Sequence, residues 1–114
     1  MKQENKIKGE AGEILAKNYL KSQKYRILET NYSNHCGEID IIAQKKKAII
    51  FVEVKARSSC EFGKPCEAVT PYKQNKISRA AQLYLQENKQ TESEIRFDVI
   101  EVLDGQINHL EGCF

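Results

Sequence analysis

The sequence predicts a single α/β domain, built from a mixed five-stranded sheet with helices on both faces. Three observations lead to this prediction. Two segments carry apolar residues at helical spacing, five shorter segments are rich in β-branched and aromatic residues, and turn signals separate most of them. With 114 residues, of which 40% are hydrophobic, the chain can bury one core but not two. We therefore expect one domain over residues 1–114, ordered as helix, three strands, helix, two strands.

The first helix is expected over residues 9–21, where apolar residues recur at helical spacing between lysines. A short strand over residues 25–28 and a polar loop over residues 31–34 should follow. Two further strands, 38–44 and 48–56, are joined by three lysines in a spacing that suits a hairpin. The apolar stripe of the first helix is expected to contain Ala11, Ile14, Leu15 and Tyr19.

The second half begins with an expected loop over residues 57–69, which contains Gly63 and Pro65. Thr70 and Pro71 then form a good amino-terminal cap and first residue of a second helix. The buried stripe of this helix should contain Ile77, Ala80, Ala81, Tyr84 and Leu85.

A long strand over residues 94–103 comes next, followed by the turn dipeptide Asp104-Gly105 and a short edge strand over residues 106–110. Hairpins pair strands antiparallel, whereas the strand-helix-strand connection pairs them parallel, so the sheet should be mixed. Residues 48–52 are all apolar, which predicts a central strand covered on both faces.

Composition leaves the partner open. The 18 Lys and Arg residues against 16 Asp and Glu give a formal net charge of +2, which permits a nucleic-acid partner without requiring one. No run of about 18 apolar residues is present, and the first ten residues do not resemble a signal peptide. We therefore expect a cytoplasmic protein without a membrane partner. In a reducing cytosol its four scattered cysteines should be free thiols, although Cys60 and Cys66 share a loop and could approach each other.

Acidic residues interrupt two strands that otherwise look buried. Side chains alternate along a strand, so Phe51, Glu53 and Lys55 should share one face. Asp40 should share a face with Glu38 and Ile42, and a hairpin loop with an even number of residues would bring Asp40 and Glu53 to the same side. These charges would be ordinary cross-strand ion pairs if that face were solvated. Beside a covered apolar strand, two carboxylates repel unless a cation lies between them.

That arrangement favours a site for a hard divalent cation, which prefers oxygen ligands. The ammonium group of Lys55 could face the same centre and stabilise negative charge developing on a phosphate. Lys73, at the inward edge of the second helix, could reach a backbone phosphate, and Arg57 is a weaker candidate for the same role. Glu13 is either an additional site carboxylate or a surface partner of Lys17.

The order of Asp40 followed by Glu53 and Lys55 in "EVK" resembles the signature of the PD-(D/E)xK nucleases, which have the restriction-endonuclease-like fold. Ile39 occupies the position usually held by proline in that signature. Over nearly the whole chain the pattern is similar to the YraN family of uncharacterised candidate endonucleases, and more distantly to archaeal Holliday-junction resolvases. The matching segments are "GE" at residues 12–13, Asn31, "GEIDIIA" at 37–43, "FVEVKAR" at 51–57, "FGKPCEAV" at 62–69, Lys73 and "RFDVI" at 96–100.

The resemblance implies a site formed by Glu13, Asp40, Glu53 and Lys55, with Asp40, Glu53 and the Val54 carbonyl as metal ligands. It implies Mg²⁺ as cofactor, with Mn²⁺ as a substitute, and hydrolysis of nucleic-acid phosphodiester bonds, most readily in DNA. Branched, single-stranded or duplex DNA and RNA remain open as substrates. A homodimer is also implied, because a two-fold symmetric junction requires two sites.

Two alternatives belong to other classes. The chain could be a catalytically silent module with a nuclease fold that binds nucleic acid or a protein partner. It could also be a redox or zinc protein built on Cys36, Cys60, Cys66 and Cys113, although their spacing is not that of a zinc site.

Overall fold

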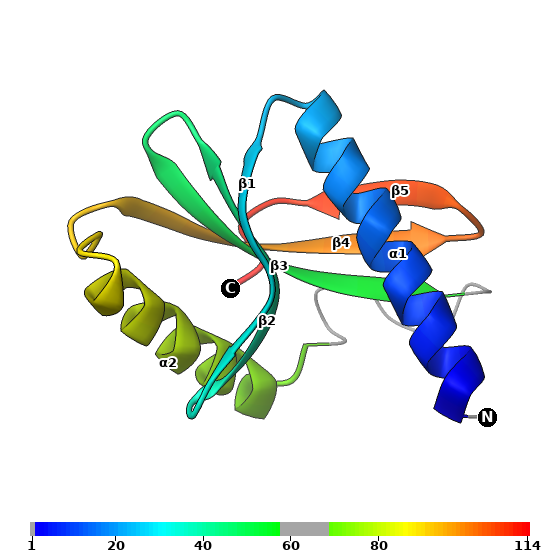
Figure 1. Cartoon of the computed structure of the whole chain (residues 1–114), viewed down its shortest axis with the longest axis horizontal. Coiled ribbons are helices and arrows are strands. Elements are labelled where there is room, and N and C mark those ends of the chain that lie inside the picture. Colours follow the sequence, from blue (N-terminus) through cyan, green and yellow to red (C-terminus); the bar gives the residue numbers. More distant parts are fainter. Residues whose placement is uncertain (1, 58–68) are drawn as a thin grey trace.

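The computed structural model describes the backbone of residues 2–57 and 69–114, and the side chains of residues 10–56 and 69–114. It has two helices and five strands in the expected order (Figure 1). The loop expected over residues 57–69 falls mostly outside this range. The elements are α1 (Lys2–Ser22), β1 (Arg26–Asn34), β2 (Gly37–Lys45), β3 (Ala48–Arg57), α2 (Pro71–Glu87), β4 (Glu94–Leu103) and β5 (Gln106–Leu110).

The five strands form one mixed sheet in the order β1-β2-β3-β4-β5. β3 and β4 are parallel, as the intervening helix α2 requires, and the other neighbouring pairs are antiparallel. The β2–β3 hairpin closes through a two-residue turn, in which Lys46 has a positive φ of 56°. The Asp104-Gly105 turn closes β4–β5 with φ of 50° and 81°, the geometry that favours this dipeptide. The predicted mixed α/β fold is therefore confirmed.

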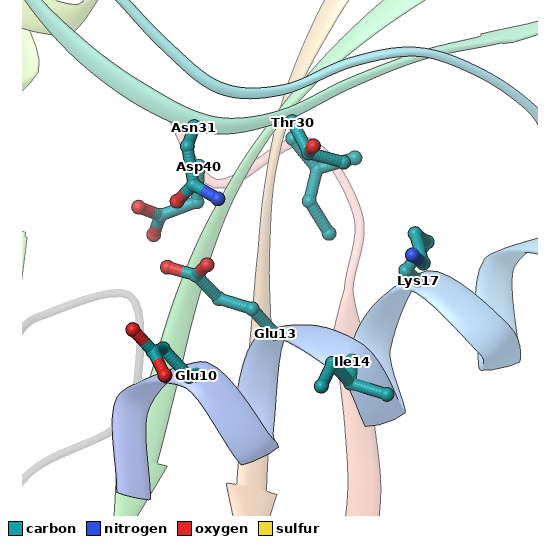
Figure 2. A pocket seen from close by; sticks show the side chains of 8 residues that line it. Glu10, Glu13, Ile14, Lys17, Thr30, Asn31 and Asp40 are labelled. Carbon is teal, nitrogen blue, oxygen red and sulfur yellow. The ribbon is translucent and has the colours of Figure 1, made fainter. Parts of the chain in front are cut away.

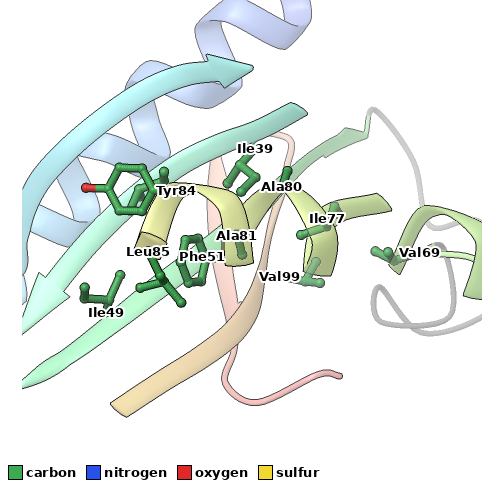
Figure 3. Packing of buried hydrophobic residues seen from close by; sticks show 11 residues of the cluster. Ile39, Ile49, Phe51, Val69, Ile77, Ala80, Ala81, Tyr84, Leu85 and Val99 are labelled. Atoms are coloured by element: carbon green, nitrogen blue, oxygen red, sulfur yellow. The ribbon is translucent and has the colours of Figure 1, made fainter. Parts of the chain in front are cut away.

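Helices α1 and α2 cover opposite faces of the sheet (Figure 1). Thr70 caps α2 through a hydrogen bond from the Lys73 amide to its hydroxyl, 3.2 Å long. Phe51 lies in the cluster beneath α2, in edge contact with Tyr84 (Figure 3). It also stacks on Phe97. All five residues predicted for the α2 stripe are buried: Ile77, Ala80, Ala81, Tyr84 and Leu85.

The first strand is longer than predicted, because the polar segment expected as a loop continues β1. Tyr32, Ser33 and Asn34 pair with residues 39, 38 and 37 of β2. β1 is the outer strand of the sheet and its residues are exposed or only half-buried, so pairing rather than burial keeps it extended. A register shift between Ile27 and Glu29 marks an irregularity in this strand.

The buried face of α1 is also different from the predicted one. Ile14 and Leu15 are 54% and 41% exposed, whereas Ala16 and Leu20 are fully buried. Gly12 lies on the same face, where an added Cβ would approach the Cβ of Ala56 to 2.9 Å. The helix contacts β3 through its smallest residues, because only they permit this close approach, and the predicted stripe is displaced toward solvent.

A buried carboxylate in the middle of β4 connects this strand to β5 and, through His109, to α1. Asp98 on β4 has no exposed surface and accepts hydrogen bonds of 2.8 Å from both Nε and Nη2 of Arg96. It also accepts hydrogen bonds from the Gly112 amide at 3.0 Å and from Nε2 of His109 at 2.7 Å. Nδ1 of His109 lies 3.1 Å from the Tyr19 hydroxyl, which joins α1 to this network. Burial alone would raise the pKa of Asp98, but the bonds from His109 and Arg96 outweigh it and hold the pKa below its usual value.

Two described cysteines differ in chemistry. Cys36 is a free thiol, whereas Cys113 is disulfide-bonded, so the expectation of four free thiols is wrong for Cys113. Neither helix in the described part of the chain is long and apolar enough to cross a membrane.

Asp98→Asn should reduce the free energy of unfolding by about 3–5 kcal/mol, because it removes one charge from a buried, hydrogen-bonded pair. Urea unfolding followed by circular dichroism measures this loss. Glu111→Gln is the matched control, since this carboxylate is 58% exposed and lies 3.6 Å from the same arginine, and it should cost less than about 1 kcal/mol. Equal losses in the two variants would contradict a central role for Asp98.

Candidate functional site

The candidate site lies where β2 separates from β3. The pairing of these strands runs from Lys45–Ala48 to Ile41–Val52 and stops there. Beyond it, the amide of Val54 donates a 2.8 Å hydrogen bond to Oδ2 of Asp40. The carboxylate therefore satisfies a backbone donor at the point where the strand ladder ends.

The alternation of side chains changes at the same point. Ile42 packs beneath α2 and Ile41 beneath α1, as alternation requires, but Ile39 packs beneath α2 together with Ile42. Asp40 lies between Ile39 and Ile41, where β2 changes its orientation. The expectation that strict alternation continues through Asp40 is wrong, and its carboxylate instead reaches the backbone of β3.

Glu53 lies on the α2 side of β3, next to Phe51. Its side chain is only 7% exposed, and Oε1 is 2.5 Å from Nζ of Lys73 and 3.8 Å from Nζ of Lys55. A carboxylate so deeply buried requires a positive partner. The nearer one comes from α2, a contact that the sequence did not predict.

On the other side, α1 contributes Glu13 to a hollow of about 250 Å³ that Asp40 also lines. Figure 2 shows the Glu13 carboxylate extending from the helix toward Asn31 and Asp40. A hydrogen bond with Asn31 stabilises the charged form of Glu13, while burial, Glu10 and Glu53 act against it, and the net effect raises the pKa of Glu13. The Glu13 side chain therefore extends into the hollow that Asp40 lines.

The electrostatics of the site are governed by burial and by repulsion between carboxylates. Burial and the nearby Glu53 raise the pKa of Asp40 to about 7, although the Val54 amide and Lys73 act in the opposite direction. Burial and Lys73 lower the pKa of Lys55. The five groups that influence one another in this way are Glu13, Asp40, Glu53, Lys55 and Lys73.

The ligand atoms available here are oxygens, the type that a hard cation prefers. Asp40 and Glu53 supply carboxylate oxygens, and the carbonyl of Val54 points to the same strand edge as its amide, because both groups of a strand residue face one neighbour. Among the described side chains, no three His, Cys, Asp or Glu residues are grouped closely enough to hold a metal ion. A cation here would depend on two carboxylates, one carbonyl and water, a set that Mg²⁺ accepts because it usually retains several waters.

The other predicted residues have different outcomes. Lys73 contacts Glu53 in the site, and 41% of its side chain remains exposed. The side chain of Arg57 lies outside the described residues. Asn31, which matched the family pattern but received no role, contacts Glu13 and has a positive φ of 51°. Only the position of Asn31 in that pattern could have indicated its place in the site.

Comparison with known proteins identifies the family. The model of the uncharacterised protein family UPF0102 matches residues 12–102. The chain belongs to UPF0102. This confirms the resemblance found in the sequence.

UPF0102 proteins from several bacteria resemble the chain over almost their whole length. The protein of Clostridioides difficile strain 630 is 51% identical, covering 96% of this chain and 98% of its own. That of Alkaliphilus oremlandii is also 51% identical, covering 96% and 99%, and that of Geotalea daltonii is 44% identical, covering 99% and 93%. Their names specify the family and no activity.

The raised pKa of Asp40 predicts how stability depends on pH when metal is removed with a chelator. An unfolded aspartate titrates near pH 3.9, so between about pH 4 and pH 7 the folded UPF0102 protein holds a proton that the unfolded chain has released. The free energy of unfolding should therefore fall as pH rises through this window, by at most about 1.4 kcal/mol per pH unit for one proton, and level off above pH 7.

Urea unfolding at several pH values with EDTA tests this dependence. Asp40→Asn should flatten the slope, because an amide still accepts the Val54 hydrogen bond but does not titrate. Glu38→Gln, an exposed position on the same strand, should leave it unchanged. An identical slope in wild type and Asp40→Asn would show that Asp40 titrates normally.

Proposed function

We propose that this UPF0102 protein is a metal-dependent endonuclease that hydrolyses phosphodiester bonds in nucleic acid, with DNA as the preferred class. The proposal rests on one observation. Asp40 and Glu53 are buried or half-buried carboxylates on adjacent strands, and they repel each other at a strand edge that also presents a backbone carbonyl. Such repulsion costs stability, and binding a divalent cation there would relieve it.

Asp40, Glu53 and the Val54 carbonyl would hold Mg²⁺, or Mn²⁺ in its place. The ion, when bound, supplies a more acidic attacking water and neutralises charge on the phosphate. Asp40 is fixed for this role because its other oxygen is held by the Val54 amide. Glu13, across the hollow on α1, would act through water or as an additional ligand.

The two lysines have separate tasks in this proposal. Lys55 lies 3.8 Å from Glu53, too far for a strong bond, so its ammonium is free to stabilise the phosphate as negative charge develops. Lys73 is bound to Glu53 directly and orients that carboxylate. Its partial exposure also leaves donors for a backbone phosphate of the substrate.

Asp40→Ala and Glu53→Ala should each abolish Mg²⁺- or Mn²⁺-dependent cleavage while the fold persists, because each removes a ligand from a repelling pair. A gel assay over branched, single-stranded and duplex DNA and RNA, with thermal melts beside it, tests both effects. Glu87→Gln, at an exposed position in the last turn of α2, should cleave as wild type does. If wild type binds nucleic acid but cleaves none of these substrates, the catalytically silent module is the better interpretation.

Lys55→Ala and Lys73→Ala should differ from each other. Lys55→Ala should reduce cleavage more, because it removes the ammonium that faces the phosphate. Lys73→Ala should destabilise the metal-free protein more, by about 1 kcal/mol after allowing for solvent screening, because it removes the nearer partner of buried Glu53.

Calorimetric titration with Mn²⁺ should show that both lysine variants retain metal binding. Lys73→Ala should also reduce the salt dependence of nucleic-acid binding by about one charge. If both variants lost stability and cleavage in the same proportion, the separate tasks proposed for the two lysines would be wrong.

A homodimer remains part of the proposal. β5 is an outer strand of the sheet, and an outer strand offers unpaired backbone groups to a second copy. Sedimentation velocity over a range of concentrations measures this association directly.

A further inference from the structure

Helix α2, which carries Lys73, also carries an exposed aromatic ring. Tyr72, in the first turn of α2, is 71% exposed. Among the described residues, four large hydrophobic side chains are strongly exposed, and Tyr72 is the aromatic one among three aliphatic ones. Its immediate neighbour in the chain, Lys73, is the residue that reaches into the site and contacts Glu53. Neighbouring residues of a helix project in different directions, so the ring is connected to the site through Lys76 and the hollow that Lys76 and Lys73 both line.

A positively charged side chain lies against this ring. Nζ of Lys76 lies 4.9 Å from the centre of the Tyr72 ring, one helical turn away. Lys73 and Lys76 also line a hollow of about 440 Å³ between α2 and the turn that connects β1 to β2. Gly37 keeps that turn close to α2, because an added Cβ would lie 3.1 Å from the carbonyl oxygen of Lys76. The hollow thus has two lysines on one wall, and the turn and the exposed carboxylate of Glu38 on the other.

An aromatic ring exposed to water beside lysines is the combination that binds single-stranded nucleic acid. Bases stack on the ring while ammonium groups hold the flanking phosphates. Stacking requires a base whose face is free, and the bases inside a duplex are already stacked on one another. The arrangement therefore favours a nucleotide that is unpaired, next to the bond that Asp40 and Glu53 are proposed to cleave.

We propose that Tyr72, Lys76 and the hollow beside them form a subsite that stacks one unpaired base and contacts its phosphate. The subsite rests on the proposed function for its purpose, since it positions a nucleotide next to the cleaved bond. Its binding chemistry is independent of cleavage. Lys73 connects the two, because one ammonium with three donors can contact both Glu53 and a phosphate.

The absence of tryptophan from the sequence allows a direct test of stacking. Tyr72→Trp introduces a single fluorescent reporter at the subsite, and Gln82→Trp introduces one at an exposed position further along α2. Both are titrated with a ten-residue oligothymidylate in EDTA, which prevents cleavage. Emission from Tyr72→Trp should be quenched as the oligonucleotide binds, while emission from Gln82→Trp should not change. Binding without quenching at Tyr72→Trp would overturn the subsite.

Affinity provides the second measurement. Fluorescence anisotropy of a labelled oligothymidylate should show binding weakened about tenfold or more by Tyr72→Ala, and by less than about threefold by Tyr72→Phe, which keeps the ring. Lys76→Ala should lower the salt dependence by about one charge. Binding of a blunt duplex should change little in Tyr72→Ala. Equal losses on single strand and duplex, or no loss on either, would overturn the proposal.

The outcomes separate the subsite from the nuclease. Quenching and selective loss of single-strand binding, in a protein that never cleaves, would leave the subsite standing and reject the nuclease. Cleavage that is unaffected by Tyr72→Ala, with no quenching, would do the reverse. If Tyr72→Ala changed only the sedimentation of the protein, Tyr72 would belong to a contact between two copies of the chain and the subsite would be rejected.

Discussion

The hydrogen bond between the Val54 amide and the Asp40 carboxylate is the constraint on which the candidate site depends. A sheet can let one strand depart from another only if the backbone groups left behind find other partners. Here a side chain supplies the partner, so the opening between β2 and β3 is created and lined by the same residue. The opening then admits Glu13 from one side of the sheet, while Glu53 approaches from the other.

A second aspartate, on the neighbouring strand β4, has the opposite environment. Asp98 is fully buried, yet its charge is satisfied by an arginine, a histidine and a backbone amide. Asp40 has one amide and a like-charged neighbour. The two aspartates therefore have pKa values displaced in opposite directions, one held low by its partners and the other raised to about 7 by burial and Glu53. The aspartate with three hydrogen-bonding partners holds neighbouring elements together, whereas the aspartate with one backbone partner and a nearby carboxylate lies at the candidate site.

Where local signals were strong, the sequence was sufficient to predict the fold. The cap at Thr70, the turn at Asp104-Gly105 and the apolar stripe of α2 each depend on neighbouring residues alone. The errors occurred where a distant contact decides. The polar end of β1 is extended because β2 pairs with it, and α1 exposes Ile14 and Leu15 because its face with Gly12, Ala16 and Leu20 lies against the sheet.

In the candidate site too, the features that depend on neighbouring residues could be predicted, and those that depend on distant contacts could not. The face of Glu53 could be predicted from the alternation along β3, whereas the orientation of Asp40 could not, because it depends on where the β2–β3 pairing ends. Lys73 was predicted only as a phosphate contact, since its bond to Glu53 requires knowing how α2 lies on the sheet. The contact of Gly12 with Ala56 also affects the size of the site. Because Gly12 has no Cβ, α1 lies close to β3, and this separation determines the gap that the Glu13 side chain must span. The position of the Glu13 carboxylate in the site therefore depends on the glycine next to it in the sequence.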